Sequence, residues 1–175
     1  FIGRMDYSMD INHPQNHKNS AFALHTCSHL KGKGYKFLFV GANDYILKDF
    51  TRLSQDLKVT DDIRVLGLRN DIPKIMAASN LLLFPSRAEG LGMVAVEAQA
   101  AGLPVLASDS IPKECVVIDE LVHFYSLSEE PRRWAYKIEE IMEKPLPNII
   151  LSDERWSHSL FNIEVSVKEL KKLYN

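Results

Sequence analysis

The stretch NLLLFPSRAEGLGMVAVEAQAAGLPVLAS, residues 80–108, contains two short apolar runs separated by a glycine-containing loop and an alanine-rich segment. The runs at 80–85 and 103–108 are rich in Leu, Val and Phe and do not clearly alternate with polar residues, which is typical of strands buried on both faces. The segment 90–101 suits a helix, and Gly102 and Pro104 stop it. This order of strand, helix and strand predicts a right-handed unit with parallel strands.

Similar units extend from this stretch in both directions. Further apolar runs, each predicted to be a strand, lie at 35–40, 63–66 and 121–125, and Phe1-Ile2-Gly3-Arg4 has the pattern of the end of another strand. Helical patterns occupy 19–30, 45–57, 72–77, 130–143 and 165–174, and Asp71 is the expected N-cap of the third. The alternation predicts one α/β domain, residues 1–175, with a doubly wound, Rossmann-like parallel sheet of about six strands.

The composition limits the classes of protein that fit this chain. Charged residues make up 25% and hydrophobic residues 46% of it, which is the profile of a globular domain. The net charge of −2 argues against nucleic acid as a partner. Two cysteines, no signal peptide and no apolar run of the roughly 20 residues that span a bilayer predict a cytoplasmic location.

Ligands of doubly wound sheets bind at the carboxyl ends of the strands. The residues expected there include Gly3, Arg4, Gly41, Leu68 and Arg69, together with the loop 86–92. Glycines in this position permit close approach of the backbone to a ligand.

The loop 86–92 carries the strongest chemical signal. Gly90, Leu91 and Gly92 open a helix, and backbone N–H groups at such a place are suited to a phosphate. Glu89 lies in the loop and Glu97 lies about two turns into the helix. A carboxylate accepts hydrogen bonds from two neighbouring hydroxyls, so this pair suits a ligand with two sugar rings.

The run FPSRAEGLGMVAVEA, residues 84–98, resembles the signature of the family 4 retaining glycosyltransferases, which have the GT-B fold. The seven residues between Glu89 and Glu97 match the spacing in that signature, and the following QAAGLPV is similar to the family's helix end and next strand. Gly3-Arg4 and Lys18-Asn19 resemble the family's basic phosphate-binding pair. The resemblance covers nearly the whole chain and is densest over 79–114.

The resemblance implies a role for each candidate residue. Glu97 would bind the ribose of a nucleotide-diphosphate sugar, and Glu89 would hold and orient the donor sugar. Arg4 and Lys18 would neutralise the diphosphate, and the N–H groups of residues 90–92 would add to that stabilisation. Leu68 and Arg69 would lie against the base, and Gly3 and Gly41 would belong to the same nucleotide-binding edge. Neither a cofactor nor a metal is expected, because the basic pair takes the place of a metal.

The resemblance also predicts what lies outside this chain. An N-terminal domain would supply the site for a saccharide or lipid-linked acceptor, and peripheral association with the inner face of the membrane would run through that domain. A UDP-sugar and a surface polysaccharide pathway are the expected donor and context. One departure concerns the segment 6–15, which is longer and more polar than the family's usual link between the residues matching Arg4 and Lys18.

Other interpretations fit parts of the sequence. A nucleotide-sugar epimerase of the same fold, and a binding module without turnover, are the alternatives for the whole chain. His25 and His29 have a spacing that suits zinc, but no third ligand is evident near them, so a partly exposed pair is the better interpretation. Core packing is favoured over sugar stacking for Trp134, and burial is predicted for Cys115.

Overall fold

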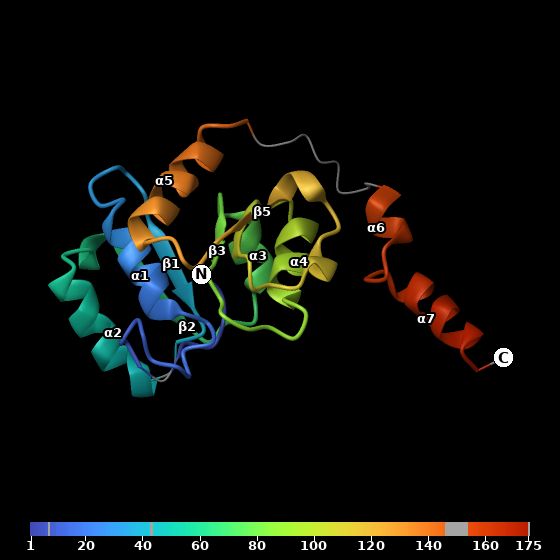
Figure 1. Cartoon of the computed structure of the whole chain (residues 1–175), viewed down its shortest axis with the longest axis horizontal. Coiled ribbons are helices and arrows are strands. Elements are labelled where there is room, and N and C mark those ends of the chain that lie inside the picture. The colour runs from blue at the N-terminus through green and yellow to red at the C-terminus, as the bar shows by residue number, and fades with distance from the viewer. Residues whose placement is uncertain (7, 43, 146–153, 175) are drawn as a thin grey trace.

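The strands of the molecule form two parallel sheets that lie side by side (Figure 1). The computed structural model describes residues 1–6, 8–42, 44–145 and 154–174. In one sheet β1 (Phe37–Val40) pairs with β2 (Ile63–Gly67). In the other, β4 (Val105–Ser108) lies between β3 (Leu82–Phe84) and β5 (Val122–Tyr125). All three pairings are parallel, as the alternation of strands and helices predicts.

The prediction of one sheet of six strands is wrong: the described residues form five strands in two sheets. The expected first strand is reduced to an isolated parallel bridge between Ile2 and Val40. Hydrogen bonds from Val40 N to Phe1 O (3.1 Å) and from Gly3 N to Val40 O (3.0 Å) hold the segment against β1. Pairing stops at Gly3, whose φ of +154° takes the chain out of extended geometry.

Six of the helices in the described ranges lie where the sequence predicts them, with small shifts at their ends, whereas the short helix α6 (Glu154–His158) was not predicted. The other six are α1 (Ser20–Ser28), α2 (Asp44–Asp56), α3 (Ile72–Ala77), α4 (Met93–Ala100), α5 (Pro131–Met142) and α7 (Ile163–Lys172). Helix α4 begins three residues later than expected, because Gly92 adopts a left-handed conformation at its N-cap. The loop before α4 is therefore longer, and its N–H groups lie outside the helix.

Two apolar clusters support the two sheets. One contains β1, α1 and α5 and centres on Trp134, which is fully buried between Phe22 and Tyr125, with ring centroids 5.4 and 5.7 Å away. The other lies under α4 and includes Cys115, also fully buried. Both the packing of Trp134 and the burial of Cys115 are thus confirmed. Complete burial of such side chains fixes the strand ends on which the candidate site stands.

Candidate functional site

Three glycines bring the ends of the first segment, β1 and β2 together at one edge. Gly41, with φ of +100°, follows β1 so closely behind Gly3 that a Cβ on it would lie 2.3 Å from the Gly3 carbonyl oxygen. Its N–H donates to the carbonyl of Gly67 at 2.6 Å. No other residue fits at position 41 without moving the backbone, so the predicted Gly3 and Gly41 do meet at the carboxyl edge.

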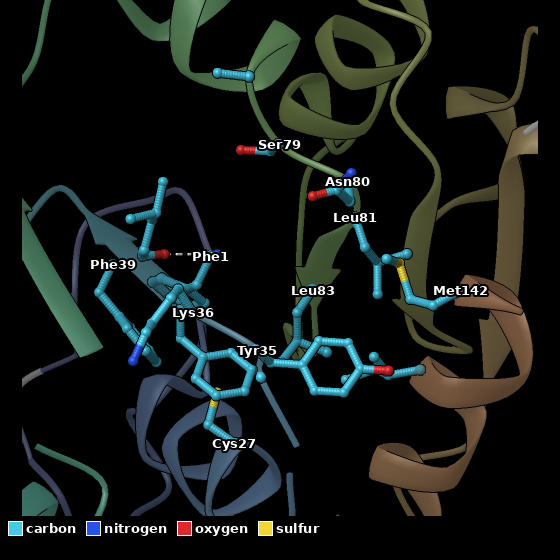
Figure 2. A pocket seen from close by; sticks show the side chains of 15 residues that line it. Phe1, Cys27, Tyr35, Lys36, Phe39, Ser79, Asn80, Leu81, Leu83 and Met142 are labelled. Atoms are coloured by element: carbon cyan, nitrogen blue, oxygen red, sulfur yellow. Dashed lines mark hydrogen bonds between the residues drawn. The ribbon is translucent and has the colours of Figure 1, made fainter. Parts of the chain in front are cut away.

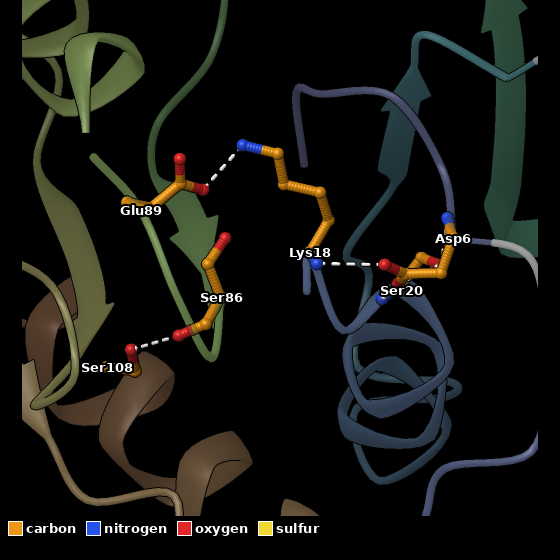
Figure 3. A network of polar contacts seen from close by, with 6 residues as sticks. All are labelled: Asp6, Lys18, Ser20, Ser86, Glu89 and Ser108. Carbon is orange, nitrogen blue, oxygen red and sulfur yellow. Dashed lines mark hydrogen bonds and ion pairs between the residues drawn. The ribbon is translucent and has the colours of Figure 1, made fainter. Parts of the chain in front are cut away.

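An ion pair between Lys18 and Glu89 lies at this same edge (Figure 3). Lys18 precedes α1, Glu89 belongs to the loop after β3, and the Lys18 Nζ lies 2.5 Å from Glu89 Oε1. The pair therefore joins the halves of the molecule that carry the two sheets. Although the segment before it is long, Lys18 still reaches the carboxyl edge, where it lies next to one of the two glutamates of the motif.

Gly3 and Arg4 border this ion pair. A Cβ on Gly3 would lie 3.7 Å from Cδ of Lys18, so the lysine stem runs along the glycine. Arg4 follows directly, is exposed, and has no hydrogen-bond or ion-pair partner within the described part of the chain. The edge thus holds one cation that is paired with a carboxylate and a second that is open to an anion.

The loop before α4 offers unused backbone donors next to Glu89. Within the described ranges, the N–H groups of Gly90, Leu91 and Gly92 donate no hydrogen bond. Gly92 has φ of +80°, and a Cβ on it would lie 3.1 Å from Ile111 Cγ2. Free donors at the start of a helix are the arrangement in which proteins bind phosphate. Ser108 Oγ donates to the carbonyl of Ser86, which ties this loop to the end of β4 (Figure 3).

Glu97 lies on the exposed side of α4 and has no partner among the described residues. A charged residue on a helix surface is ordinarily solvated or joined to a neighbouring cation in an ion pair. Glu97 forms none, so its carboxylate is available to a ligand.

Leu68 and Arg69 lie at the end of β2, beyond Gly67. The Leu68 side chain is 83% exposed. Arg69 donates through Nε and Nη2 to the two oxygens of Asp71 at 2.8 and 2.7 Å, and these hydrogen bonds lower the pKa of Asp71 and raise that of Arg69. Asp71 stands at the N-cap of α3, but its side chain does not cap the helix as predicted, because Arg69 takes both of its oxygens.

A cavity of about 520 Å³ lies elsewhere, between β1 and β3 (Figure 2). Lys36, Phe37, Asn80 and Leu81 in its wall come from the amino-terminal ends of these strands. The wall combines apolar side chains with the polar Lys36 and Asn80 and includes the buried Cys27, whose pKa burial raises to about 12. The cavity therefore opens at the edge opposite the ion pair and contains none of the predicted site residues.

Two residues near the ion pair were missed by sequence reasoning. Asp6 is 6% exposed and accepts hydrogen bonds from Lys18 N and Ser20 N at 2.8 and 2.7 Å. Arg87 donates to backbone carbonyls of residues 11 and 13. Arg87 lies in the predicted loop 86–92, but the sequence gives no signal for the contacts of either side chain, because the partners of Asp6 lie 12 to 14 residues away and those of Arg87 lie 74 to 76 residues away.

Two further properties concern metals and membranes. Across the described ranges, no group of three or more His, Cys, Asp or Glu side chains is placed to hold a metal ion. Among the helices of these ranges, none combines the length and the apolar character that crossing a membrane requires.

Parallel strands joined by helices, with glycine turns and charged side chains at the carboxyl edge, define an α/β domain of the class that binds ligands at that edge. A family model described as "Glycosyl transferases group 1" matches residues 1–144. The chain belongs to this family, GT4, and corresponds to the C-terminal half of its GT-B enzymes.

Two relatives illustrate the family membership. The protein EpsF of Bacillus subtilis (strain 168) is 33% identical over 159 residues, which are 90% of this chain and 41% of EpsF. The UDP-Gal:alpha-D-GlcNAc-diphosphoundecaprenol alpha-1,3-galactosyltransferase of Escherichia coli is 30% identical over 146 residues, which are 79% of this chain and 36% of that protein. The chain thus spans less than half the length of these relatives.

Solved structures share the fold. Anabaena Alr3699/HepE in complex with UDP superposes with a TM-score of 0.74 at 19% identity, covering 99% of this chain and 48% of HepE. The C-terminal domain of the group 1 glycosyl transferase LpcC of Francisella tularensis has a TM-score of 0.61 at 19% identity and covers 89% of this chain and 80% of that domain. The second match identifies which half of a GT-B enzyme this fold represents.

Proposed function

We propose that this chain binds the nucleotide-diphosphate sugar of a retaining glycosyltransferase, with a UDP-sugar as the donor. The observation that carries the proposal is the meeting of Lys18 and Glu89 beside three unused backbone N–H groups. The E. coli relative is named for UDP-Gal, and HepE was solved with UDP and with UDP-glucose, which supports uridine as the base.

The diphosphate would lie between Lys18, Arg4 and the N–H groups of Gly90, Leu91 and Gly92. These groups together supply two positive charges and the positive end of the α4 dipole. They are in place before the reaction, so they stabilise the negative charge that grows on the diphosphate as the glycosidic bond breaks. No metal is needed in this scheme, because the two cations do the neutralising.

The two glutamates would bind the two sugar rings. When the diphosphate binds the ammonium of Lys18, Glu89 is released from its ion pair and accepts hydrogen bonds from hydroxyls of the donor sugar. Glu97 accepts hydrogen bonds from the ribose, and Leu68 and Arg69 lie beside the base. Neither glutamate acts as a nucleophile: the acceptor hydroxyl attacks on the face that the diphosphate leaves, and the departing phosphate oxygen takes its proton. This route retains the anomeric configuration.

The complete enzyme would transfer the sugar to a saccharide or lipid-linked acceptor in surface polysaccharide synthesis. In this proposal an N-terminal domain binds the acceptor in the cytoplasm and associates peripherally with the inner face of the membrane. The present chain alone would bind donor without transferring sugar.

Calorimetric titration with UDP, GDP and ADP, without added metal, tests the proposal. Saturable binding of UDP, weakened in Glu97→Ala, is the expected result. Preference for GDP or ADP would change the assignment of the base but leave the proposed site unchanged. Absence of binding at millimolar concentration of all three would reject a donor site in this chain. In a separate activity assay, turnover of UDP-glucose to UDP-galactose would favour the epimerase.

A further inference from the structure

The peptide group between His17 and Lys18 is held at both of its polar atoms. Its carbonyl oxygen accepts a hydrogen bond from Arg87 N at 2.7 Å, and its N–H donates to Asp6 Oδ1 at 2.8 Å. The two partners come from opposite sides, because Asp6 precedes α1 while Arg87 follows β3. The backbone of Lys18 is therefore fixed relative to both halves of the molecule, although a long polar segment leads into it.

The Arg87 side chain makes a second attachment to the same segment. Its Nη1 donates to the carbonyl of His13 at 3.2 Å, and its Nη2 donates to the carbonyl of Ile11. Inside the segment, Asn16 is fully buried and donates through Nδ2 to the carbonyls of Ser8 and Asp10 at 2.9 and 2.8 Å. Residues 8–17 thus form an internally bonded loop that Arg87 fastens to the loop after β3.

We propose that Arg87 is a positioning residue that holds Lys18 opposite Glu89, with Asp6 as the second anchor. Arg87 and Glu89 are two residues apart on one short loop. The guanidinium that holds the loop 8–17 and the carboxylate that Lys18 contacts therefore move together. Both terminal nitrogens of Arg87 are already bound to carbonyls, which leaves Arg4 and Lys18 as the cations facing the diphosphate. The effect of Arg87 on that ligand rests on the proposed function, whereas its effect on Lys18 does not.

The geometry explains why arginine is needed at this position. A planar guanidinium directs several N–H groups in fixed directions and spans two carbonyl oxygens at once. A lysine has the same charge but one ammonium on a flexible stem. The Arg87 main-chain N–H that holds the His17 carbonyl remains in any Arg87 variant, so the side chain acts on Lys18 by fixing the loop 8–17 that leads into it. Lys18 itself has a flexible stem, so a shift of this loop would displace its ammonium, and misplacement by about 1 Å is enough to weaken a preorganised charge contact severely.

The test measures Lys18 directly and then measures binding. The 15N signal of the Lys18 ammonium is recorded in the unliganded chain, with Glu89→Gln defining the signal of the broken pair. Arg87→Ala and Arg87→Lys are both expected to shift the Lys18 signal toward that value, while Arg133→Ala, an exposed arginine on α5, leaves it unchanged. Asp6→Ala removes the oxygen that accepts from Lys18 N, serves as the second variant if the Arg87 variants unfold, and is expected to shift the Lys18 signal in the same direction. An unchanged Lys18 signal in folded variants, or full rescue by Arg87→Lys, overturns the proposal.

UDP affinity then links the anchor to the ligand. Arg87→Ala is expected to weaken UDP about 10-fold, but less than about 2-fold when Lys18→Ala is already present, because two changes that act through one group are not additive. Equal losses in both backgrounds would show that Arg87 acts independently of Lys18 and would overturn the proposal. If the parent chain binds no UDP, the donor site fails, and the ammonium signal alone decides the role of Arg87.

Discussion

The two edges of the sheets differ in the chemistry of the groups that they expose. The amino-terminal edge has a cavity of about 520 Å³ with a wall of mixed apolar and polar side chains and a buried thiol. The carboxyl edge has the Lys18–Glu89 pair, the exposed Arg4 and the unused N–H groups of residues 90–92. Empty volume marks the first edge, whereas converging charges and free donors mark the second. The proposed function places the ligand at the second edge, because a phosphate needs donors and positive charge.

The largest expected effect concerns the backbone of the carboxyl edge. Gly41→Ala places a Cβ 2.3 Å from the Gly3 carbonyl oxygen and keeps φ at +100°. Clash and strain together are expected to lower the free energy of unfolding by about 3 kcal/mol or more. Gly67→Ala is the matched control: its φ is also positive, at +61°, but no heavy atom lies within 4 Å of the new Cβ. Its cost should be about 1 kcal/mol. Equal melting temperatures for the two variants would disprove the close approach at Gly41.

Substitution of one lysine at each edge compares the two edges directly. Lys18→Ala removes a charge-assisted contact to the diphosphate, which is expected to weaken UDP binding about 10- to 100-fold. Lys36→Ala removes a cation from the cavity wall at the amino-terminal edge and is expected to change UDP affinity by less than about 2-fold. Calorimetry of both variants gives the comparison. A larger loss in Lys36→Ala would move the ligand to the opposite edge.

The carboxyl edge should itself divide into a phosphate part and a ribose part. Glu97→Ala is expected to weaken UDP about 10-fold through lost hydrogen bonds to the ribose. It should leave the affinity for inorganic pyrophosphate unchanged, because pyrophosphate has no hydroxyls for the carboxylate to accept from. Competition titrations with the two ligands separate these effects. Equal losses for UDP and pyrophosphate would contradict the ribose assignment.

The smallest effect is expected at the amino-terminal edge. Burial raises the pKa of Cys27 to about 12, so its thiolate fraction at pH 8 is on the order of 10³ lower than that of an ordinary thiol. In a Cys115→Ala background, Cys27 should resist a disulfide reagent until denaturant is added, and UDP should not alter its rate. Rapid labelling of the folded chain, slowed by UDP, would show instead that ligand enters the cavity.

Local sequence patterns predicted most of the fold. Each of the five strands lies within one residue of its predicted run or inside it, because a short apolar run between polar or turn-forming residues carries its own signal. The first segment also has such a pattern, but a strand needs a ladder of partners, and this segment bridges at Ile2 alone. Asp71 has the right position for an N-cap, yet its side chain accepts hydrogen bonds from Arg69 and does not cap the helix. Helix propensity rules do not include such a contact.

The site was predictable to the extent that its residues share a motif. Glu89, Glu97 and the glycine loop are contiguous in the sequence, whereas Lys18 reaches Glu89 across 71 positions. The residues that make this approach possible, Asp6 and Arg87, act on backbone atoms of distant segments. A contact of that kind depends on how the loop 8–17 folds, so Asp6 was not identified beforehand, and Arg87 lies within the motif without a role that the motif predicts.

Residue-resolved NMR titration of the chain with UDP, without added metal, tests the central claim most directly. The claim predicts that amide signals of Lys18, Gly90, Leu91 and Gly92 shift in a saturable way while those of Phe37 and Leu81 stay in place. Shifts confined to the cavity wall at the amino-terminal edge, with the loop 90–92 unchanged, would contradict it.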